Sequence, residues 1–439
     1  MSESSQPDRF GFLHIDLNSF FASVEQQIHP EYRNRPLAVV PTMADTTCCI
    51  AASYEAKGLG IKTGTQVGEA KRICPEIVLV AGNHDHYAEY SHKISAAVDR
   101  CCPVAHTPSI DEMVCQLMGR EQEPPRARRI ALEIKQAIKD DVGETLRCSI
   151  GMAPNRYLAK IASDMQKPDG LIGLLPSQLP RAIAHLELRD LPGVGAKTEV
   201  RLIAKGITTM PQLLALDRNA MHGLWDSVWG DRLYHWLRGG DTGDDGAPLP
   251  SDLQKSLGHS HVLGPEFRSE EGAWSVAHKL LHKAAMRLRM EQFYTGSLAV
   301  TIRYQLTREQ AAQVQAKRHT SGIKHSGWGM EARFPECQDT LSLLEVLKRL
   351  WQQRPHGEGF ERPFFVGVTL RNLIPASEHQ ESLFGDGDRR GELSATMDKL
   401  NLKYGHSTLH FAGMLAARET APTRIAFTQI PVQYGVDYM

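Results

Sequence analysis

Three carboxylates stand at or beside predicted strand ends. Asp16 lies near the end of an apolar strand over 10–18, and the acidic pair Asp111 and Glu112 lies between two apolar flanks. If the three converged, their charges would repel, and at least one pKa would be raised in the absence of a cation. Two Mg²⁺ ions about 3.5–4 Å apart would remove that penalty by neutralising the carboxylates. One ion would lower the pKa of an attacking hydroxyl, and the other would neutralise charge on the leaving phosphates. Two alternatives stay open. Asp16 could cap a strand-to-helix turn, and Asp111 and Glu112 could lie at a solvated hairpin tip.

Three further residues could hold a polyphosphate. Tyr54, Lys57 and Lys167 stand at turns or helix starts, with Lys167 inside the segment 166–170. A triphosphate needs such donors on the side away from the attacking group. Taken singly, each of the three fits an ordinary surface residue better.

The elements that would position these residues alternate between strands and helices. Apolar runs and helical periodicity predict an α+β sheet domain that carries an inserted helical subdomain. Strands are predicted at 10–18, 36–40, 77–80 and 148–152, and helices at 20–28, 64–74, 86–101, 125–141 and 155–165.

The second half of the chain has a different pattern. Short helices follow residue 170, and the Gly- and Asp-rich segment 239–250 has the composition of a linker. Beyond it the predicted order is β-α-β-β-α-β, a compact sheet with two helices on one face. Its strands are predicted at 255–263, 296–306, 328–334 and 364–371, and its helices at 271–290 and 340–353.

Composition excludes several classes of protein. The 439 residues suffice for two to four domains, no apolar run could span a bilayer, and the polar N-terminus lacks a signal-peptide core. The eight cysteines include no Cys-x-x-Cys pair, which argues for a reducing compartment rather than a zinc knuckle or a disulfide framework. The net charge is −1, but residues 251–375 carry 17 basic and 12 acidic side chains. This segment is therefore the plausible one for contact with nucleic acid.

Several motifs occur in the order and spacing of one known family. They are Ile15–Glu25, Ser53–Lys57, Ser109–Glu112, Ser149–Gly151, Leu158–Gly170 and Leu191–Gly195. Together they resemble the Y-family translesion DNA polymerases, most closely the bacterial DNA polymerase IV branch. The resemblance covers roughly residues 10–375, and the ordered set is highly specific although each motif alone would be weak.

The resemblance implies a multi-domain α+β fold of the right-hand polymerase type, with a helix-hairpin-helix thumb and a β-α-β-β-α-β little finger. The expected boundaries are palm 10–19 and 82–170, fingers 20–81, thumb 171–240, linker 241–251, little finger 252–375 and C-terminal extension 376–439.

The resemblance also implies a catalytic metal site. Asp16, Asp111 and Glu112 would be the catalytic carboxylates and would hold two Mg²⁺ ions as the cofactor. The backbone carbonyl of Leu17 would be a further ligand.

Nucleotide-binding roles follow in the same way. Tyr54, Lys57 and Lys167 would grip the triphosphate of an incoming dNTP, helped by backbone amides near Phe20. Phe21 occupies the family's steric-gate position, where a flat ring leaves no room for a 2′-hydroxyl. Without the family, Phe21 would be an ordinary core residue at a helix start.

The segment Leu191–Gly195 resembles the helix-hairpin-helix turn that binds DNA. Gly193 and Gly195 would let backbone N–H groups approach a phosphate, with Lys197 following, and such contacts hold a duplex without reading its sequence. The alternative is a pair of helices joined by a glycine turn.

Three departures from the family pattern stand out. Lys57 replaces a common Arg, so its phosphate contact would be a point charge rather than a fork. Asn18 and Ser19 replace a commoner Asp and an aromatic residue. Cys48 and the bulky Ile50 fall near the expected cover of the nascent base pair and leave the lesion preference open.

The segment Gln380–Phe384 resembles the pentapeptide that binds the bacterial sliding clamp. Gln380 would supply an amide, and Leu383 and Phe384 would fill an apolar pocket. In the extension, Leu393, Met397, Leu400 and Tyr404 have the spacing of one helical face, and 423–432 has strand-like content. No function is predicted for this extension.

The function predicted is that of a low-fidelity, template-directed DNA polymerase that inserts deoxynucleotides opposite damaged template. Its expected partners are primer-template DNA, dNTP and the sliding clamp; it is expected to be monomeric, away from membranes and in the bacterial cytoplasm, associated with the nucleoid when active. A non-catalytic Y-family-like scaffold of a mutagenesis complex is one alternative, and retention of Asp16, Asp111, Glu112 and Lys167 argues against it. A DNA-binding adaptor is another, and it leaves the carboxylates unexplained.

Overall fold

The computed structural model describes residues 8–45, 47–240, 255–307, 309–310, 325–380, 387–405, 408–418 and 420. They fall into two compact units, one on either side of residue 247, and each unit is described by itself. Among these residues, no helix is both long and apolar enough to cross a membrane.

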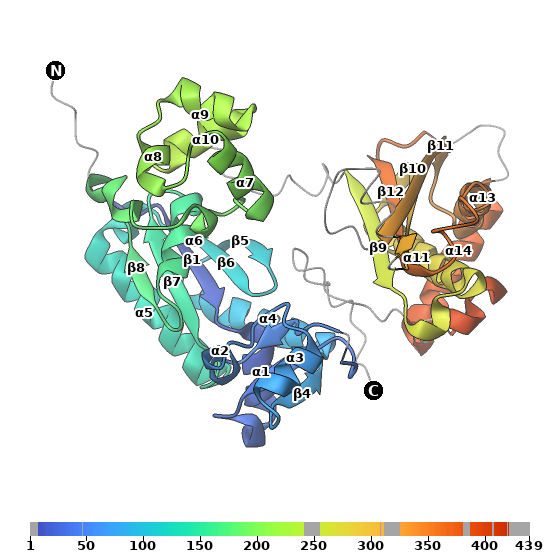
Figure 1. Ribbon diagram of the computed structural model, residues 1–439, viewed down its shortest axis with the longest axis horizontal. Coiled ribbons are helices and arrows are strands. Elements are labelled where there is room, and N and C mark those ends of the chain that lie inside the picture. The colour runs from blue at the N-terminus through green and yellow to red at the C-terminus, as the bar shows by residue number, and fades with distance from the viewer. Residues whose placement is uncertain are drawn as a thin grey trace. The chain divides into compact units, whose positions relative to one another are not determined.

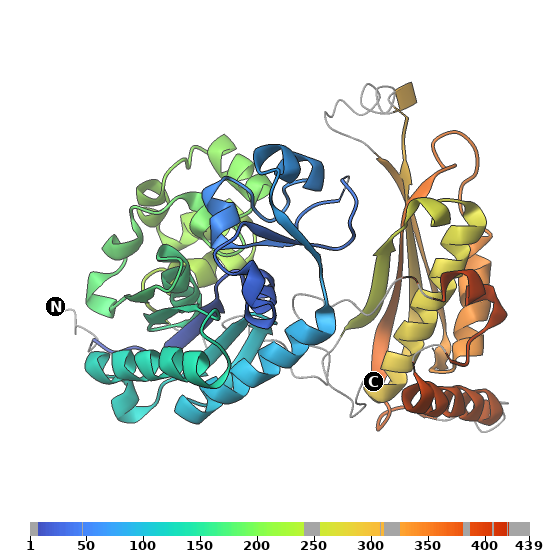
Figure 2. The same cartoon turned by 90° about the horizontal axis from the view of Figure 1, so that it is seen from below.

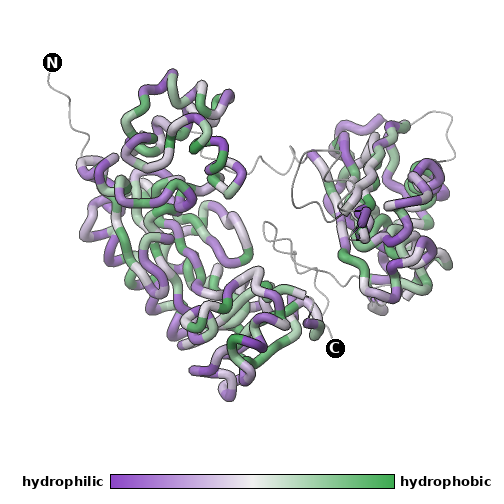
Figure 3. The backbone as a smooth tube through the Cα atoms, viewed as in Figure 1, coloured by the Kyte–Doolittle hydropathy of each residue, from purple (hydrophilic) through white to green (hydrophobic). Residues whose placement is uncertain are grey.

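The N-terminal unit is built on a mixed five-stranded sheet of order β5-β6-β1-β7-β8 (Figure 1). Its strands are β1 (Phe12–Leu17), β5 (Val104–Ser109), β6 (Glu112–Gln116), β7 (Cys148–Ala153) and β8 (Leu171–Gly173). All six residues of β1 are buried, because the strand is central and is covered on both faces. Figure 3 shows hydrophobic stretches of the chain within this unit. The predicted strand over 10–18 is thereby confirmed in shorter form.

Helices cover both faces of this sheet. Leu13, Ile15 and Leu17 pack into one core with α4 (His84–Cys101) and α5 (Pro124–Asp141). Phe12 packs on the other face with α6 (Arg156–Met165). Since side chains alternate along a strand, His14 and Asp16 lie on the α6 face.

Gly151 lets α6 lie directly on β7. A Cβ atom at this position would stand 2.0 Å from the Ala159 carbonyl oxygen and 2.4 Å from the Ser163 nitrogen, so any other residue would push the helix away. The Ser-Ile-Gly motif therefore sets the distance between α6 and the Asp16 strand.

The fingers segment contains a second, three-stranded sheet of order β3-β2-β4. Its elements are β2 (Leu37–Val40), β3 (Ala51–Ala52), α2 (Tyr54–Gly58), α3 (Val67–Ile73) and β4 (Val78–Ala81). Helix α1 (Phe20–Ile28) precedes them and packs into the palm core. The two-residue strand β3 was not predicted.

The thumb segment is a set of short helices, as expected. They are η3 (Pro176–Gln178), η4 (Arg181–Ile183), η5 (Leu188–Asp190), α7 (Ala196–Ala204), α8 (Met210–Leu214), α9 (Arg218–Trp225) and α10 (Val228–Trp236). One boundary needs correction: β8, at 171–173, hydrogen-bonds to β7 and belongs to the palm sheet rather than to the thumb. The helix before the Leu191–Gly195 turn is also only the one-turn η5.

The C-terminal unit confirms the predicted β-α-β-β-α-β order. Its elements are β9 (Ser256–Val262), η7 (Pro265–Phe267), α11 (Glu270–Met290), β10 (Phe293–Gln305), β11 (His325–Cys337), α13 (Thr340–Trp351) and β12 (Pro363–Pro375). The sheet is antiparallel with order β11-β10-β12-β9. Figure 2 shows the helices of this unit on one side of the sheet.

The described part of the C-terminal extension belongs to this unit. It forms α14 (Gly387–Tyr404) and η8 (Ala412–Ala417), which pack against α11 and α13. The residues that α14 buries are polar: Ser394, Asp398 and Asn401. The helix is thus confirmed, but the apolar stripe is only partly covered: Met397 and Leu400 are half-buried, whereas Leu393 is 47% and Tyr404 61% exposed. The strand-like segment 423–432 lies outside the described residues.

One histidine under the extension should make this unit acid-sensitive. His282 in α11 is 6% exposed, its ring lies edge-on to Phe411 at 6.0 Å, and burial lowers its pKa to about 4. The charged groups that act on it are Asp398, which raises the pKa, and Arg289 and His410, which lower it.

Because the folded-state pKa of His282 lies below the unfolded value of about 6.5, the unfolded chain binds more protons between these values. The contribution of neutral, buried His282 to the stability of the folded unit is complete above about pH 6.5 and is lost as the pH falls toward 4. We expect the opening free energy of α11 amides to fall by about 3 kcal/mol from this residue between pH 7 and pH 4. Hydrogen exchange, corrected for intrinsic rates, should show a smaller fall in His282→Phe but not in the exposed control His356→Gln. Equal acid sensitivity in His282→Phe and wild type would contradict this prediction.

Candidate active site

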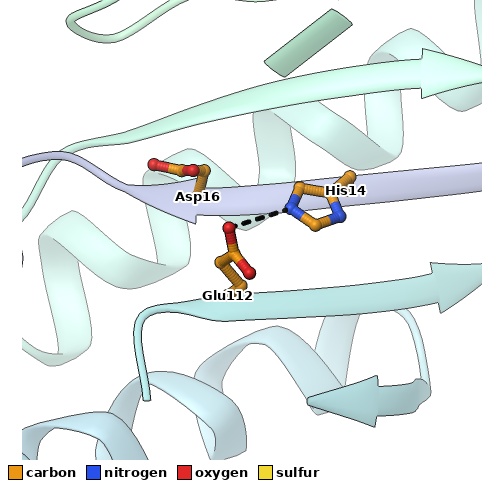
Figure 4. A group of neighbouring side chains, drawn as sticks. All are labelled: His14, Asp16 and Glu112. Atoms are coloured by element: carbon orange, nitrogen blue, oxygen red, sulfur yellow. Dashed lines mark ion pairs between the residues drawn. The ribbon is translucent and has the colours of Figure 1, made fainter. Parts of the chain in front are cut away.

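The site begins where β1 and β6 pair at the end of the palm sheet. Asp16 is in register with Glu112, and the Leu17 N–H donates to the Asp111 carbonyl at 2.9 Å. One ligand atom from each of His14, Asp16 and Glu112 lies within 4.8 Å of the other two, and Figure 4 shows the Glu112 carboxylate directed at the His14 ring with Asp16 beside them. Two of the three predicted metal ligands are therefore brought together. No structural observation tests the Leu17 carbonyl as a further ligand.

Asp111 is close to this cluster but not part of it. Its carboxylate accepts a hydrogen bond from the Ser109 hydroxyl at 2.6 Å. Burial raises the pKa of Asp111, and the charges of Asp16 and Glu112 raise it further, while the Ser109 hydrogen bond opposes them. This is the carboxylate for which like-charge repulsion is expected to act.

Two lysines from the α6 region neutralise the carboxylates. Lys160 Nζ lies 2.7 Å from Asp16 Oδ2, 2.5 Å from Glu112 Oε1 and 3.3 Å from Asp164 Oδ2. Lys167 Nζ lies 2.7 Å from Asp16 Oδ1 and 2.8 Å from Asp164 Oδ1. Asp16, Lys160, Asp164 and Lys167 thus form a closed ring of alternating charge.

The pKa shifts follow from this arrangement. Burial acts to raise the pKa of Glu112, but His14, 3.8 Å away, and the charge of Lys160, which contacts the carboxylate at 2.5 Å, outweigh it and hold the pKa below its usual range. Burial acts to lower the pKa values of Lys160 and Lys167, yet the neighbouring carboxylates raise both. At neutral pH the two lysines are ammonium ions and Glu112 is a carboxylate.

Two of the predicted triphosphate residues, Tyr54 and Lys57, come to this site from the fingers. Lys57 Nζ donates to the Ser19 hydroxyl at 2.7 Å and stands 4.6 Å from the centre of the Tyr54 ring. Burial and the charge of Lys167 lower the pKa of Lys57, and the charge of Asp16 opposes them. Burial raises the pKa of Tyr54, while the charge of Lys167 lowers it and the charge of Asp16 raises it further.

Phe20 and Phe21 start helix α1 and are 3% and 6% exposed. The Phe21 ring stacks on the Tyr87 ring at 4.2 Å with an interplanar angle of 12°. Tyr87 is itself fixed, because its hydroxyl donates to Glu25 at 2.6 Å. Phe21 is therefore held rigidly from one side.

Asn18 organises the loop that carries Lys167. Its side chain donates to the Ser149 hydroxyl at 3.2 Å and accepts from the Asp169 N–H at 2.7 Å. This residue was noted only as a departure from the family pattern, so its role in the loop was missed.

The turn of the thumb exposes the glycines expected to meet DNA. Gly193 has φ +87°, a left-handed conformation that favours glycine, and Gly195 is the N-cap of α7 with an open surface at its Cα. Lys197 is exposed next to them. Of the clamp-motif residues, Gln380 is exposed, whereas Leu383 and Phe384 lie outside the described residues.

No role was assigned from the sequence to His14, Lys160 or Asp164. Two signals could have found them. His14 lies two residues before Asp16 on a strand, which places both on one face. Lys160 and Lys167 flank Asp164 at helical spacings of four and three residues, where side chains meet.

The donor set fits a hard divalent cation. Carboxylate oxygens are the ligands that Mg²⁺ prefers, and Asp16 and Glu112 present them together at a strand end. His14 Nε2 completes the group: it is buried without a hydrogen-bond partner among the described residues and lies 3.8 Å from Glu112 Oε1, so it faces the carboxylate without a hydrogen bond.

Comparison with known proteins identifies the family to which the chain belongs. Residues 15–164 match the impB/mucB/samB family, and residues 254–383 match the C-terminal domain of that family. The chain belongs to this family, that of the Y-family DNA polymerases. The Treponema denticola protein called DNA polymerase IV is 33% identical over 92% of this chain and 96% of its own. The Moorella thermoacetica protein of the same name is 32% identical over 91% and 95%.

Solved structures agree at the level of the fold. A Y-family polymerase chimera of Dbh and Dpo4 covers 83% of this chain and 99% of its own with a TM-score of 0.66 and 22% identity. The insertion ternary complex of Dbh DNA polymerase gives a TM-score of 0.55 with the same coverage and identity. The prediction of a right-hand Y-family fold with a little finger is confirmed.

Proposed function

We propose that this chain is a template-directed, low-fidelity DNA polymerase that extends primers opposite damaged template bases. The observation that carries the proposal is the meeting of Asp16 and Glu112 at the end of the palm sheet, with Asp111 beside them and lysines around them. Two Mg²⁺ ions bound there would supply Lewis-acid chemistry at the primer hydroxyl and at the leaving phosphates.

The chain's own residues would prepare this reaction. Asp16, Asp111 and Glu112 would hold the ions, and a primer 3′-hydroxyl would be oriented beside them. Tyr54, with Lys57 and Lys167, would bind the nucleotide triphosphate. The hydrogen bond from Lys57 to Ser19 and the ion pair from Lys167 to Asp16 would then give way to phosphate oxygens.

The open face of the little-finger sheet supports DNA as the partner. Along its strands, exposed arginines alternate with residues that have little or no side chain, so a phosphate backbone could come close. The exposed arginines are Arg303, Arg333 and Arg371, and small residues are their partners in register: Gly327 pairs with Arg303, Ser297 with both Arg333 and Arg371, and Ser256 with Arg371. Arg371 is paired with Glu331 at 2.7 Å, which would lower its affinity for phosphate.

Bypass of damage is the part of the proposal that a lesion assay tests. A primer placed one base before a template lesion should be extended past it by this protein at a rate within about a hundredfold of that on undamaged template. A panel of defined lesions would also show which of them the bulky Ile50 tolerates. If every lesion stopped extension while undamaged template was copied, the chain would be a polymerase but not a translesion enzyme.

Phe21→Ala should increase ribonucleotide incorporation. The Phe21 ring is backed by Tyr87, so it cannot move away from a 2′-hydroxyl, and alanine would open that space. We expect the ratio of dNTP to rNTP incorporation efficiency to fall at least tenfold, about 1.4 kcal/mol of discrimination. Phe20→Leu, at the adjacent buried ring, is the control and should leave the ratio unchanged. A steady ratio in Phe21→Ala would remove the gate role.

Substituting the clamp motif should separate two activities. With Leu383→Ala and Phe384→Ala, stimulation of primer extension by a bacterial sliding clamp should be lost, because both apolar anchors are removed. Extension without clamp should stay at the wild-type rate. Undiminished clamp stimulation in this variant would show that the motif is a chance match.

A further inference from the structure

Lys160 has a position that the triphosphate-binding role of Lys167 does not explain. Its ammonium group touches two of the proposed metal ligands at once, Asp16 at 2.7 Å and Glu112 at 2.5 Å. A third carboxylate, Asp164, lies 3.3 Å from it in the next turn of the same helix. The side chain is 24% exposed, so solvent screens these contacts only in part.

The geometry around Lys160 is fixed by the fold. Gly151 brings α6 onto β7, and this close packing places Lys160 over the end of β1, where Asp16 lies. Glu112 reaches the same ammonium from β6, with His14 Nε2 3.8 Å from its carboxylate. The three groups therefore come from three different elements and meet without needing a ligand.

We propose that Lys160 is a built-in counter-ion of the metal-binding carboxylates and keeps the divalent-cation affinity of the nucleotide-free site low. An ammonium within hydrogen-bonding distance of both Asp16 and Glu112 neutralises part of the charge that attracts a dication, and it repels that dication directly. Lys160 is thus a positioning and affinity-setting residue, and this inference rests on the proposed metal site.

This role has a consequence for the order of binding. The carboxylates alone would attract a divalent ion weakly, and the oxygens of a nucleotide triphosphate would supply the missing negative charge. The site would then be filled mainly when nucleotide arrives with its ion. Lys167 differs, because its expected phosphate contact would draw it away from Asp16.

The test is a Mn²⁺ titration of the full-length protein without DNA or nucleotide, followed by electron paramagnetic resonance of free Mn²⁺. Lys160→Met and Lys160→Gln should each bind Mn²⁺ at least tenfold more tightly than wild type. Lys160→Arg keeps the charge and should stay closer to wild type. Lys93→Met, which removes a surface lysine paired with Glu89, controls for net charge and should change nothing.

Asp16→Asn separates the two levels of the account. If Asp16→Asn binds Mn²⁺ as tightly as wild type, the proposed metal site itself fails. If Asp16→Asn binds Mn²⁺ more weakly, but both neutral Lys160 variants bind Mn²⁺ no more tightly than wild type, only the counter-ion role is overturned. Melting temperature with and without Mn²⁺ gives a second readout: the Mn²⁺-induced rise should be larger in Lys160→Met than in wild type, and an equal or smaller rise overturns the proposal.

Discussion

Replacing Asp111 and Glu112 together by alanine is expected to lower Mg²⁺-dependent primer extension at least about 10³-fold, which corresponds to roughly 4 kcal/mol of transition-state stabilisation. The reason is the arrangement at the end of the palm sheet. Glu112 shares its site with Asp16 and His14 within 4.8 Å, and the half-buried Asp111 lies beside them. Without two of the three carboxylates, the site could no longer hold two ions that act on the hydroxyl and phosphates.

The measurement is single-turnover extension of a labelled primer, with DNA binding followed in parallel by fluorescence anisotropy. DNA affinity should not fall, because the variant removes negative charge and leaves the thumb turn and little-finger arginines intact. The matched control is Asp140→Ala with Asp141→Ala, an adjacent acidic pair exposed at the end of α5. Extension by the Asp111 and Glu112 variant within tenfold of wild type would contradict the assignment.

Asp398→Ala is expected to lower the opening free energy of the little finger by about 3–5 kcal/mol. Asp398 in α14 accepts two hydrogen bonds from Arg289, at 2.6 and 2.9 Å, and both side chains are about one-tenth exposed. Arg289 also donates to the Gln338 carbonyl at 2.7 Å and to Thr340 at 3.2 Å. Removing the carboxylate would leave a guanidinium buried without its counter-ion.

Hydrogen exchange of peptides from α11 and α14 would measure this loss in the full-length protein. Replacing the pair with Arg289→Met and Asp398→Leu should recover most of the stability, because the cost arises from the unpaired charge. Arg390→Ala removes a more exposed partner of Glu345 at 3.1 Å and should cost under about 1 kcal/mol. Equal effects of Asp398→Ala and Arg390→Ala would contradict the role of the buried pair.

The little finger could be predicted from sequence because its strands and helices are long and strongly patterned. All six predicted elements appear within a few residues of their expected limits, except that β11 and β12 extend further at both ends. The strand β3 could not be predicted, since two residues show no periodicity. The end of the palm was misplaced for a similar reason: the three residues of β8 gain their identity only by pairing with β7.

The packing face of α14 shows a different limit. Leu393 and Tyr404 suggest an apolar stripe, yet the helix buries Asp398 instead, because Arg289 lies buried more than a hundred residues earlier and requires an anion. Local periodicity contains no information about that distant charge.

The candidate site was likewise only partly predictable from the sequence. Asp16 and Glu112 were noted at strand ends and assigned as metal ligands through the family resemblance, and the structure brings them together. Lys160 was given no role from the sequence, because its role depends on contacts with Asp16 and Glu112 on two different strands. Helix α6 lies close enough to make these contacts because Gly151 has no side chain.

The central claim is that the site around Asp16 and Glu112 performs template-directed nucleotide transfer. Its most direct test uses four primer-templates that differ only in the templating base, each mixed with Mg²⁺ and one dNTP at a time. We predict that the purified protein adds one nucleotide in all four cases, with the complementary dNTP favoured, and that EDTA or Asp16→Asn abolishes the addition. No Mg²⁺-dependent extension on any template, or addition that ignores the templating base, would contradict the claim.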